Sequence, residues 1–538
     1  MSREQHRVKS LLSPLQLLLT LAAFCFVFLA MVIPNRVTWL DAMSFAYLPL
    51  EIFVLGLALL LTGLFGKLLR AGLALVLAAG VIFRIADMAA FQVFSRPFNP
   101  VFDTYLLAFG FHFLESSFGI IVAVVAAVFA TGLAAAIVLL AFVVLARLHR
   151  VVRSAPKVTG SAMLAGVIVW GGMSVAGSAR HSRYFYDQFA MHVESTFTSI
   201  ADLRDFKTVV NVDAYATVPG DTLFGALRGK DVLVVFIESY GRTLLDKAEY
   251  AELFRPSLQA ATQELTEAGY LSRSAFLTSP TVGGISWLAH GTALSGLWID
   301  SQVRYDSLMM SDRPSLVRLF QRAGWRTVGV MPAISMAWPE GDYFGYDQLY
   351  TAPDLGYKGA PYNYVTMPDQ FTLSQFQKFE RNVAQREPIM AEIALLSSHA
   401  PWTPVPAMIP WENVGDGSIF SEEATSGDSP EVVWRDRDRV LKQFRECIEY
   451  VIDSLVSFTN TFGNDDLVIL MMGDHQPMPY VTDNTENRDV PIHIIARDPA
   501  VMKAIESWQW SEGMLPANDA PVWRMDTIRD RFIEAFSR

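Results

Sequence analysis

The segment Asp231-Val-Leu-Val-Val-Phe-Ile-Glu-Ser-Tyr-Gly241 joins an apolar run to a carboxylate and a polar turn. Its six apolar, mostly β-branched residues, Val232–Ile237, predict a buried strand that ends at Glu238. Two later apolar runs also end in polar groups, Ser397-Ser398-His399 and Gly473-Asp474-His475. Because ligands of open α/β sheets bind outside the carboxyl ends of the strands, these endings predict one shared site.

Strand-like and helix-like segments alternate along the chain after this strand. Further strands are predicted at Arg326–Met331, Ile389–Leu396, Leu467–Met472 and Ile492–Ala496, and helices at Pro256–Gly269, Ser315–Ala323 and Val432–Thr459. Trp411–Pro430 is rich in Gly, Ser, Asp and Glu, which predicts an exposed loop. Such alternation is typical of a sheet covered by helices on both faces. We therefore predict an α/β domain over residues 225–538, large enough for its own core.

The composition indicates a membrane part joined to a soluble part. Of the 538 residues, 52% are hydrophobic and only 18% are charged. The net charge of −11 disfavours a nucleic-acid-binding surface, which needs a basic face. The two cysteines, Cys25 and Cys447, lie far apart in the sequence, and we expect no disulfide.

The first third of the chain contains apolar runs of the length that crosses a bilayer, about 20 residues. They are Leu11–Ile33, Phe45–Phe65, Leu68–Phe91, Phe118–Leu145 and Val158–Ala179. The first run lacks a small-x-small cleavage site and is followed by four others, so we interpret it as a retained helix. The sequence thus predicts a transmembrane domain of about five helices over residues 1–179.

The positions of Lys and Arg predict the orientation of these helices. Basic residues precede the first run and occupy alternate connections: Arg3, Arg7, Lys9, Lys67, Arg70, Arg147, Arg150, Arg153 and Lys157. The positive-inside rule places the N-terminus in the cytoplasm, and five crossings place the α/β domain outside. Residues 180–224 are predicted to form a juxtamembrane linker with short helices, whose aromatic residues lie at the membrane surface or pack against the outer domain.

Three ionisable residues, Glu51, Arg84 and Asp87, lie within the apolar runs. Charges in a bilayer are costly and have partners or a function. Arg84 and Asp87 are three residues apart and share a helix face. Two roles remain open here: an ion pair that joins helices, or contact with a lipid headgroup.

The chemistry is carried by four pieces of the α/β domain. Gly283-Gly284 leads into Ser286 at the predicted start of a helix, where unpaired N–H groups suit a phosphoryl or sulfuryl group. Glu238, Asp474 and His475 with the Ser286 hydroxyl form a credible tetrahedral site for a divalent metal. The metal would lower the pKa of that hydroxyl for nucleophilic attack. His399 would protonate a leaving group or activate an acceptor.

Each piece alone also has a purely structural interpretation. An Asp-His pair after a strand is usually a turn, and a Gly-Gly pair before a helix is often only a helix start. His399 alone would serve equally well as a structural histidine. The combination favours a site, because every piece stands at a predicted strand end or helix start of one domain.

With these motifs, the chain resembles the membrane-anchored sulfatase-like transferases of the alkaline phosphatase superfamily. That group includes lipoteichoic acid synthases, periplasmic glucan phosphoglycerol transferases and lipid A phosphoethanolamine transferases. The resemblance implies a bacterial cytoplasmic-membrane protein with a single divalent metal, Mn²⁺, Zn²⁺ or Mg²⁺. It implies metal ligands at Glu238, Asp474, His475 and the nucleophile Ser286. Contacts to the substrate are implied for His399, Trp338 and His290.

The chain also departs from the family pattern. The nucleophile is Ser286, followed by Ser295-Gly296, where the transferases usually have threonine, and Thr281 is an alternative nucleophile. The motif that sulfatases convert to formylglycine is absent, since Leu288 and His290 stand at its later positions. The disulfide-forming cysteines common in phosphoethanolamine transferases are missing as well, which favours the phosphoglycerol-transferring branch.

The resemblance therefore implies transfer of phosphoglycerol from phosphatidylglycerol through Ser286 to an envelope glycan or glycolipid, with release of diacylglycerol. Alternatives are phosphatidylethanolamine as the donor, a phosphodiesterase or sulfatase-type hydrolase, and a non-catalytic sensor. The partners expected are the membrane, the phospholipid donor and the acceptor, without nucleic acid. The oligomeric state is left open, and a monomer is compatible with the sequence.

Overall fold

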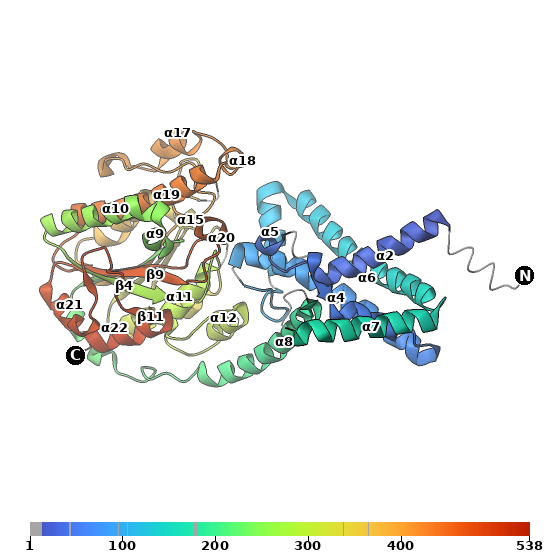
Figure 1. Cartoon of the computed structure of the whole chain (residues 1–538). Coiled ribbons are helices and arrows are strands. Elements are labelled where there is room, and N and C mark those ends of the chain that lie inside the picture. The colour runs from blue at the N-terminus through green and yellow to red at the C-terminus, as the bar shows by residue number, and fades with distance from the viewer. Residues whose placement is uncertain are drawn as a thin grey trace, which may run out of the picture. The chain divides into compact units, whose positions relative to one another are not determined.

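The computed structural model describes residues 13–41, 45–94, 96–104, 106–176, 181–336, 338–363 and 365–537. The chain divides into two compact units, Met1–Gln92 with Arg96–Asp202, and Val93–Ser95 with Leu203–Arg538 (Figure 1). Arg3, Arg7, Lys9 and the predicted boundary at residue 179 lie outside the described residues.

The predicted linker of short helices is wrong in one respect, because most of it is a single helix. α8 (Tyr184–Val209) is 26 residues long and runs through the boundary between the units. It contains neither Gly nor Pro, and Asp187 in its first turn and Lys207 in its last turn complement the helix dipole. Two 3-10 turns follow, Gly220–Thr222 and Gly225–Leu227.

The first unit contains four helices that are long and apolar enough to cross a membrane among the described residues. They are α2 (Pro14–Val32), α4 (Gly63–Phe94), α6 (Ile120–Val152) and α7 (Pro156–Val175). The predicted count of five is not confirmed, because the run Phe45–Phe65 holds only the nine-residue α3 (Leu50–Ala58). A turn follows α3, and α4 begins at Gly63, which adopts a left-handed φ of 71°.

Two smaller corrections follow from the helix bounds. Lys67 and Arg70, expected between two spans, lie within α4. The segment Arg96–Glu115, which lies between the predicted runs Leu68–Phe91 and Phe118–Leu145, contains most of α5 (Leu106–Phe118). α4 begins five residues before the predicted run Leu68–Phe91, and α5 is a separate helix between α4 and α6.

α3 lies antiparallel to α7. Close approaches run in opposite order along the two helices: Phe53 with Gly166, Gly56 with Met163, and Leu60 with Gly160. Before α3, β1 (Leu48–Pro49) pairs with β2 (His181–Ser182), which follows α7. The segment from Leu48 to Leu60 therefore follows α7 from beyond its C-terminal end back to its second turn.

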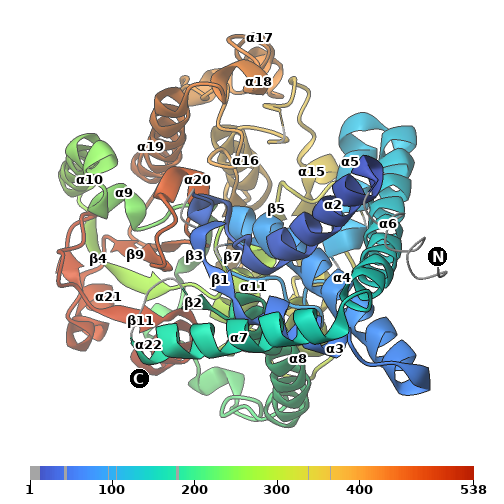
Figure 2. The ribbon, with the colours of Figure 1, turned by 45° about the vertical axis from the view of Figure 1, so that its right-hand side comes forward.

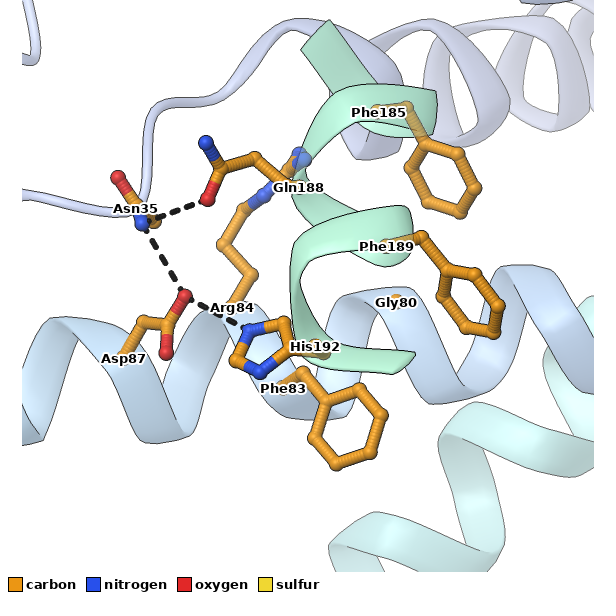
Figure 3. Close-up of a pocket in the computed structure, with 9 residues that line it drawn as sticks. All are labelled: Asn35, Gly80, Phe83, Arg84, Asp87, Phe185, Gln188, Phe189 and His192. Carbon is orange, nitrogen blue, oxygen red and sulfur yellow. Dashed lines mark hydrogen bonds and ion pairs between the residues drawn. The ribbon is translucent and has the colours of Figure 1, made fainter. Parts of the chain in front are cut away.

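A buried polar network holds the start of α8 to the other helices (Figure 3). Asp87 of α4 accepts hydrogen bonds from Asn35 Nδ2 and from His192 Nε2, each at 3.1 Å. Asn35 Nδ2 also donates to Gln188 Oε1 at 2.9 Å. These residues come from the segment after α2, from α4 and from α8, so the network joins three parts of the unit.

Arg84 and Glu51, the other two ionisable residues within the predicted apolar runs, also have protein partners. Arg84 donates to the carbonyl of Ala30 at 2.5 Å, and Glu51 accepts the backbone N–H of Tyr186 at 2.9 Å. Arg84, Asp87 and Glu51 thus connect helices within the unit, which supports the structural one of their two possible roles.

The second unit is built on a nine-stranded mixed sheet of order β10-β4-β9-β8-β3-β7-β5-β6, with β11 beside β4. The strands are β3 (Asp231–Ile237), β4 (Leu271–Thr278), β5 (Arg326–Met331), β6 (Gln348–Thr351), β7 (Ile389–Leu395), β8 (Leu467–Gly473), β9 (Asp489–Ala496), β10 (Ser511–Glu512) and β11 (Val522–Arg524). β3 lies at the centre and pairs in parallel with β7 and β8. β9 is antiparallel to both β8 and β4.

Helices cover both faces of this sheet, as predicted. Leu233, Val235 and Ile237 of β3 face one apolar core, and Val232, Val234 and Phe236 face the other. The first core is closed by α10 (Ala248–Glu267), α16 (Asp369–Phe376) and α19 (Arg437–Phe462), and the second by α11 (Ser286–Ser295), α13 (Leu316–Arg322) and α22 (Ile528–Phe536). Figure 1 and Figure 2 show α10 and α19 on one side of the sheet and α11 and α22 on the other.

The predicted helix Val432–Thr459 is two helices, α18 (Pro430–Val433) and α19, because Asp436 caps a new helix start. The predicted loop Trp411–Pro430 contains short helices, and Val414, Phe420 and Ala424 within it are buried.

Candidate active site

Glu238, Asp474 and His475 meet at the carboxyl end of the central strands. Ile237 is paired with Gly473, so the residues that follow β3 and β8 emerge side by side. Asp474 Oδ1 accepts the backbone N–H of Ser239 at 2.8 Å and that of His475 at 2.6 Å. These bonds fix the Asp474 carboxylate against the end of β3.

Ser286 is brought to this place by a tight loop. Gly283, Gly284 and Ile285 all have positive φ, and the loop is held to the end of β8 by a bond from Gly283 N to Gln476 O at 2.8 Å. A positive φ at a β-branched residue such as Ile285 is strained, and such strain clusters at functional sites. α11 then begins at Ser286 itself.

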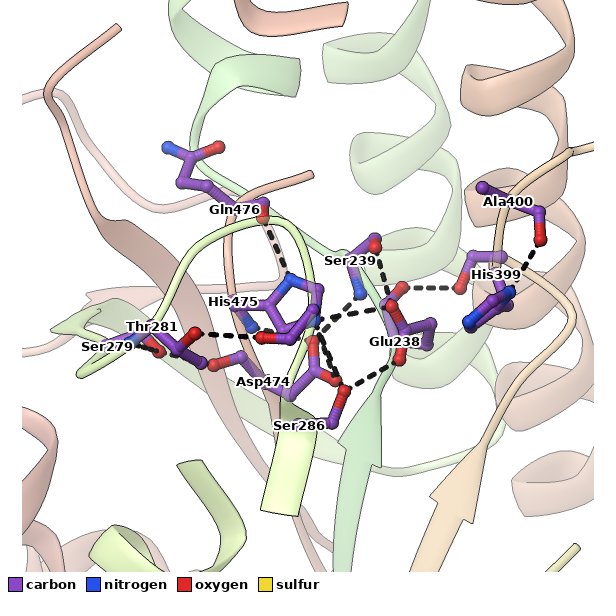
Figure 4. Close-up of polar contacts among 12 residues, drawn as sticks. Glu238, Ser239, Ser279, Thr281, Ser286, His399, Ala400, Asp474, His475 and Gln476 are labelled. Carbon is purple, nitrogen blue, oxygen red and sulfur yellow. Dashed lines mark hydrogen bonds and ion pairs between the residues drawn. The ribbon is translucent and has the colours of Figure 1, made fainter. Parts of the chain in front are cut away.

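The Ser286 hydroxyl points into the cluster (Figure 4). Its Oγ–H donates to Glu238 Oε2 at 2.9 Å, and Oγ lies 3.2 Å from His475 Nε2. As the first residue of α11, Ser286 also stands where backbone N–H groups and the helix dipole favour an anion. The predicted nucleophile and the predicted ligands therefore form one cluster.

The donor atoms fit a divalent metal ion. One ligand atom each from Glu238, Asp474 and His475 lies within 4.8 Å of the others, and all three residues are buried. His475 Nδ1–H donates to the carbonyl of Gln476 at 2.8 Å, which leaves the Nε2 lone pair directed to the cluster. Two carboxylates, an imidazole and a hydroxyl suit a four-coordinate ion.

Burial and charge set the protonation of the two carboxylates. Burial opposes the charge on Glu238, but the positive charges of His475 and His399 and the Ser239 and Ser286 hydroxyls hold its pKa at about 2. Burial, followed by the negative charge of Glu238, raises the pKa of Asp474 to about 6. Glu238 is therefore ionised at neutral pH, and Asp474 is the carboxylate that titrates.

We expect metal binding to weaken in acid. Asp474 takes up a proton as the pH falls below about 6, and the carboxylates outweigh burial and raise the pKa of His475, which acts in the same direction. Because ligands bind metal in their deprotonated form, affinity should fall roughly tenfold per pH unit below about 6. Titration calorimetry of the metal-free protein with Zn²⁺ or Mn²⁺ at several pH values measures this. Equal affinity across that range would contradict the assignment of Asp474 as a ligand.

His399 lies beside the cluster and is exposed. It follows β7, and its Nδ1–H donates to the carbonyl of Ala400 at 2.5 Å. The preceding residue is tied down, since Ser398 Oγ–H donates to the Glu238 carbonyl at 2.5 Å. His399 thus presents an exposed imidazole next to Glu238, and its contact with a substrate phosphate stays a prediction.

Asp369 holds the segment that leads from β7 to His399. Its carboxylate accepts the backbone N–H of Leu396 at 2.7 Å and of Ser397 at 3.1 Å. Burial raises its pKa to about 7. Sequence analysis missed Asp369 because it stands at the start of a helix far from any motif.

Within the described residues, the side chains of three predicted residues form no hydrogen bond to Glu238, Ser286, Asp474 or His475. Thr281 Oγ–H donates to the Gly284 carbonyl at 2.8 Å, so its hydroxyl is used within the loop, and the geometry favours Ser286 as the nucleophile. Trp338 stacks on Phe344, with ring centroids 5.7 Å apart.

His290, the third, is held inside the domain one turn after Ser286. Its Nδ1–H donates to Glu392 Oε1 at 2.7 Å, and its ring stacks on Phe236 at 3.9 Å between centroids. Glu392 is itself only 1% exposed. Sequence analysis missed Glu392, although a lone carboxylate within the apolar run Ile389–Leu396 was the signal that could have indicated it.

Residues 230–515, more than half of the chain, match the family model described as Sulfatase. The chain belongs to the sulfatase family. The matched region contains every residue of the cluster, and the match confirms the resemblance to sulfatase-like proteins of the alkaline phosphatase superfamily. No curated protein sequence matches this sulfatase-family chain.

Solved structures similar to this chain include three bacterial proteins. The lipoteichoic acid synthase LtaP from Listeria monocytogenes is 15% identical with a TM-score of 0.38, and the match covers 62% of this chain and 78% of LtaP. The phosphoglycerol transferase GacH of Streptococcus pyogenes, in complex with sn-glycerol-1-phosphate, is 10% identical with a TM-score of 0.37, covering 62% and 91%. The C-terminal periplasmic domain of EptC from Escherichia coli is 17% identical with a TM-score of 0.34, covering 49% and 72%.

Proposed function

We propose that this protein transfers the phosphoglycerol headgroup of phosphatidylglycerol to an envelope glycan or glycolipid through a covalent intermediate on Ser286. The observation that carries the proposal is the Ser286 hydroxyl, held at 2.9 Å from Glu238 Oε2 and 3.2 Å from His475 Nε2 at the start of a helix. A serine in this setting is prepared for attack on a phosphodiester rather than for a structural role.

The residues divide the reaction into two displacements. Glu238 orients the Ser286 hydroxyl, which loses its proton to solvent as its oxygen attacks phosphorus, so that a Ser286–phosphorus bond forms while the bond to the diacylglycerol oxygen breaks. His399 gives a proton to that leaving oxygen, and later takes the proton of the acceptor hydroxyl that displaces Ser286. The serine oxygen takes a proton back from solvent when it is displaced in the second step. A divalent ion held by Glu238, Asp474, His475 and Ser286 would lower the pKa of the serine hydroxyl and stabilise charge on the phosphoryl group.

Two observations bear on the alternatives. Both cysteines are free, Cys25 on the surface and Cys447 buried, so the chain lacks the disulfides that we associate with phosphoethanolamine transferases. This supports phosphatidylglycerol over phosphatidylethanolamine as the donor. A non-catalytic scaffold would have no need of a complete set of buried ligands, and hydrolysis would require only that water replace the acceptor.

The membrane unit would keep the site near its lipid donor. We infer five crossings, with the N-terminus in the cytoplasm and the α/β domain outside. The support is the segment Leu48–Leu60, which follows α7 in the opposite direction over most of its length. Near the other end of α3, His149 Nδ1–H donates to the Leu59 carbonyl at 2.7 Å, and Arg70 donates to the Leu61 carbonyl at 3.2 Å. Basic residues gather at that end, as the positive-inside rule requires of the cytoplasmic side.

Cysteine labelling tests this orientation. In a Cys25→Ser background, Ser426→Cys in the α/β domain should react with an impermeant maleimide on intact cells. Thr62→Cys after α3 and Ser154→Cys between α6 and α7 should react only after the membrane is permeabilised. All three positions are exposed to solvent or lie in turns. Reaction of Thr62→Cys on intact cells would mean that α3 does not cross the membrane.

The donor is tested by measuring diacylglycerol release from the purified full-length protein. Phosphatidylglycerol and phosphatidylethanolamine are offered separately in detergent micelles with a divalent metal. Release from phosphatidylglycerol is the expected result. Release from phosphatidylethanolamine alone would indicate a phosphoethanolamine transferase, and release from neither lipid would favour a soluble substrate or a non-catalytic role.

A further inference from the structure

Arg36 is a basic residue of the membrane unit whose hydrogen-bonding groups have no acceptor among the described residues. It follows α2 by four residues and precedes the 3-10 helix η1 (Val37–Trp39). Its guanidinium carbon lies 4.5 Å from the ring centroid of Trp39 and 4.1 Å from that of Phe91 in α4. Its Nε is buried without a hydrogen-bond partner.

This arrangement leaves the edges of the guanidinium for a ligand. The rings of Trp39 and Phe91 lie against the guanidinium, and ring contacts of this kind leave its in-plane N–H donors available for hydrogen bonds. The planar fork of N–H donors matches the oxygens of a phosphate group. A buried N–H without an acceptor is rare and costly, which indicates that an acceptor from outside the chain completes the site.

The surroundings of Arg36 identify the source of that phosphate as a lipid. Val37, Trp39 and Leu40 are 48%, 52% and 48% exposed, so an apolar and aromatic rim surrounds the cation at the end of a membrane-length helix. Trp and Arg are the residues that settle at the headgroup level of a bilayer. A soluble anion would gain nothing from this rim, whereas a phospholipid would place its acyl chains against it.

Arg36 lies at the end of the membrane unit where α8 begins. The backbone N–H of its neighbour Asn35 donates to Tyr184 Oη at 3.0 Å, and the Tyr184 hydroxyl donates to Asn35 Oδ1 at 2.7 Å. Tyr184 opens α8, the helix that leads into the α/β domain. By contrast, the buried charges Arg84 and Asp87 both hydrogen-bond to protein groups.

We propose that Arg36, between Trp39 and Phe91, binds the phosphodiester of a membrane glycerophospholipid and so holds the donor lipid at the end of the membrane unit where α8 begins. The identity of this lipid as the donor rests on the proposed function, but its binding does not. Arg36 belongs to the membrane unit and is not a member of the Ser286 cluster, so its loss should change the capture of lipid and leave the chemistry of the cluster intact.

The test uses full-length protein with Arg36→Gln, Arg36→Lys and the matched control Arg183→Gln. Arg183 precedes α8 at the same end of the unit, is 62% exposed and pairs with Asp187 at 3.1 Å. Phosphatidylglycerol retained after delipidation is counted by native mass spectrometry, with and without excess inorganic phosphate. Diacylglycerol release is measured against the mole fraction of phosphatidylglycerol in micelles. Turnover of bis(p-nitrophenyl) phosphate reports on the cluster without a membrane lipid.

Arg36→Gln should lose the retained lipid. The mole fraction of phosphatidylglycerol that gives the half-maximal rate should rise about tenfold, while kcat and the turnover of the soluble diester stay unchanged. Arg36→Lys, which keeps the charge but not the fork, should show a smaller rise, and Arg183→Gln none. Equal lipid retention and equal half-saturation in Arg36→Gln and the parent would overturn the proposal. So would a lower melting temperature as the only effect, since that marks a cation–π contact that serves folding alone. Displacement of the lipid by inorganic phosphate would also overturn it.

The two proposals fail in different ways. If the parent releases no diacylglycerol but Arg36→Gln still loses its retained lipid, the proposed function fails and the lipid site stands. If the parent releases diacylglycerol and Arg36→Gln does so with unchanged half-saturation and lipid count, the lipid site fails and the proposed function stands.

Discussion

Replacing Ser286 by alanine is expected to reduce diacylglycerol release by roughly 10³-fold or more, because the reaction loses its nucleophile. The Ser286 Oγ is the hydroxyl that Glu238 and His475 hold, at 2.9 and 3.2 Å. Alanine removes one oxygen atom and fits the start of α11 without a clash. Lipid release and metal content are measured together, so that loss of the metal is separated from loss of the nucleophile.

Thr281→Ala is the matched control for this substitution. Thr281 belongs to the same loop, but its hydroxyl donates to the Gly284 carbonyl at 2.8 Å. We expect this variant to keep most of its activity, with a modest loss from the missing loop hydrogen bond, worth about 1 kcal/mol. Loss of activity in Thr281→Ala with activity kept in Ser286→Ala would reverse the assignment of the nucleophile.

Replacing Asp474 by asparagine is expected to remove the metal and to lower activity about as much as Ser286→Ala. Asparagine keeps one carbonyl oxygen for the N–H groups of Ser239 and His475 but removes the negative charge that a divalent ion needs. Elemental analysis of the purified variant and diacylglycerol release with added Zn²⁺ or Mn²⁺ provide the measurement.

The control for this charge change is Asp465→Asn, because the side chain of Asp465 is 88% exposed. It should bind metal and release diacylglycerol like the parent. A metal-free Asp474→Asn variant with full activity would mean that the cluster works without an ion, and would discard the proposed chemistry.

The centre of the sheet could be predicted because its signal is local. β3, β5, β7 and β8 are short apolar runs, and each lies within one residue of its predicted bounds. β4 was not predicted, since Ser272, Arg273 and Ser274 interrupt its apolar pattern and its place in the sheet depends on its partner β9. The ends of the parallel strands were therefore sufficient to predict that Glu238, Asp474 and His475 lie together.

The remaining misses depend on partners that are distant in the sequence. α3 has the composition of a membrane span, but it ends at Ala58 after nine residues, and only its approach to α7 explains its course. Glu392 and Asp369 acquire their roles from His290 and from the loop before His399, which no spacing in the sequence indicates. Polar groups that act through a second residue are recognisable only once the fold brings them together.

The backbone bonds at Asp474 limit which ion can reside in the cluster. Oδ1 is committed to the N–H groups of Ser239 and His475, and on Glu238 the Ser239 hydroxyl donates to Oε1 at 2.7 Å. Each carboxylate therefore offers essentially a single oxygen, so that neither can chelate an ion with both. Ca²⁺ takes roughly six to eight oxygen ligands and often binds a carboxylate through both oxygens. Zn²⁺ needs only four donors, which can include nitrogen. We therefore expect the cluster to select against calcium through two main-chain amides at Asp474 and the Ser239 hydroxyl at Glu238.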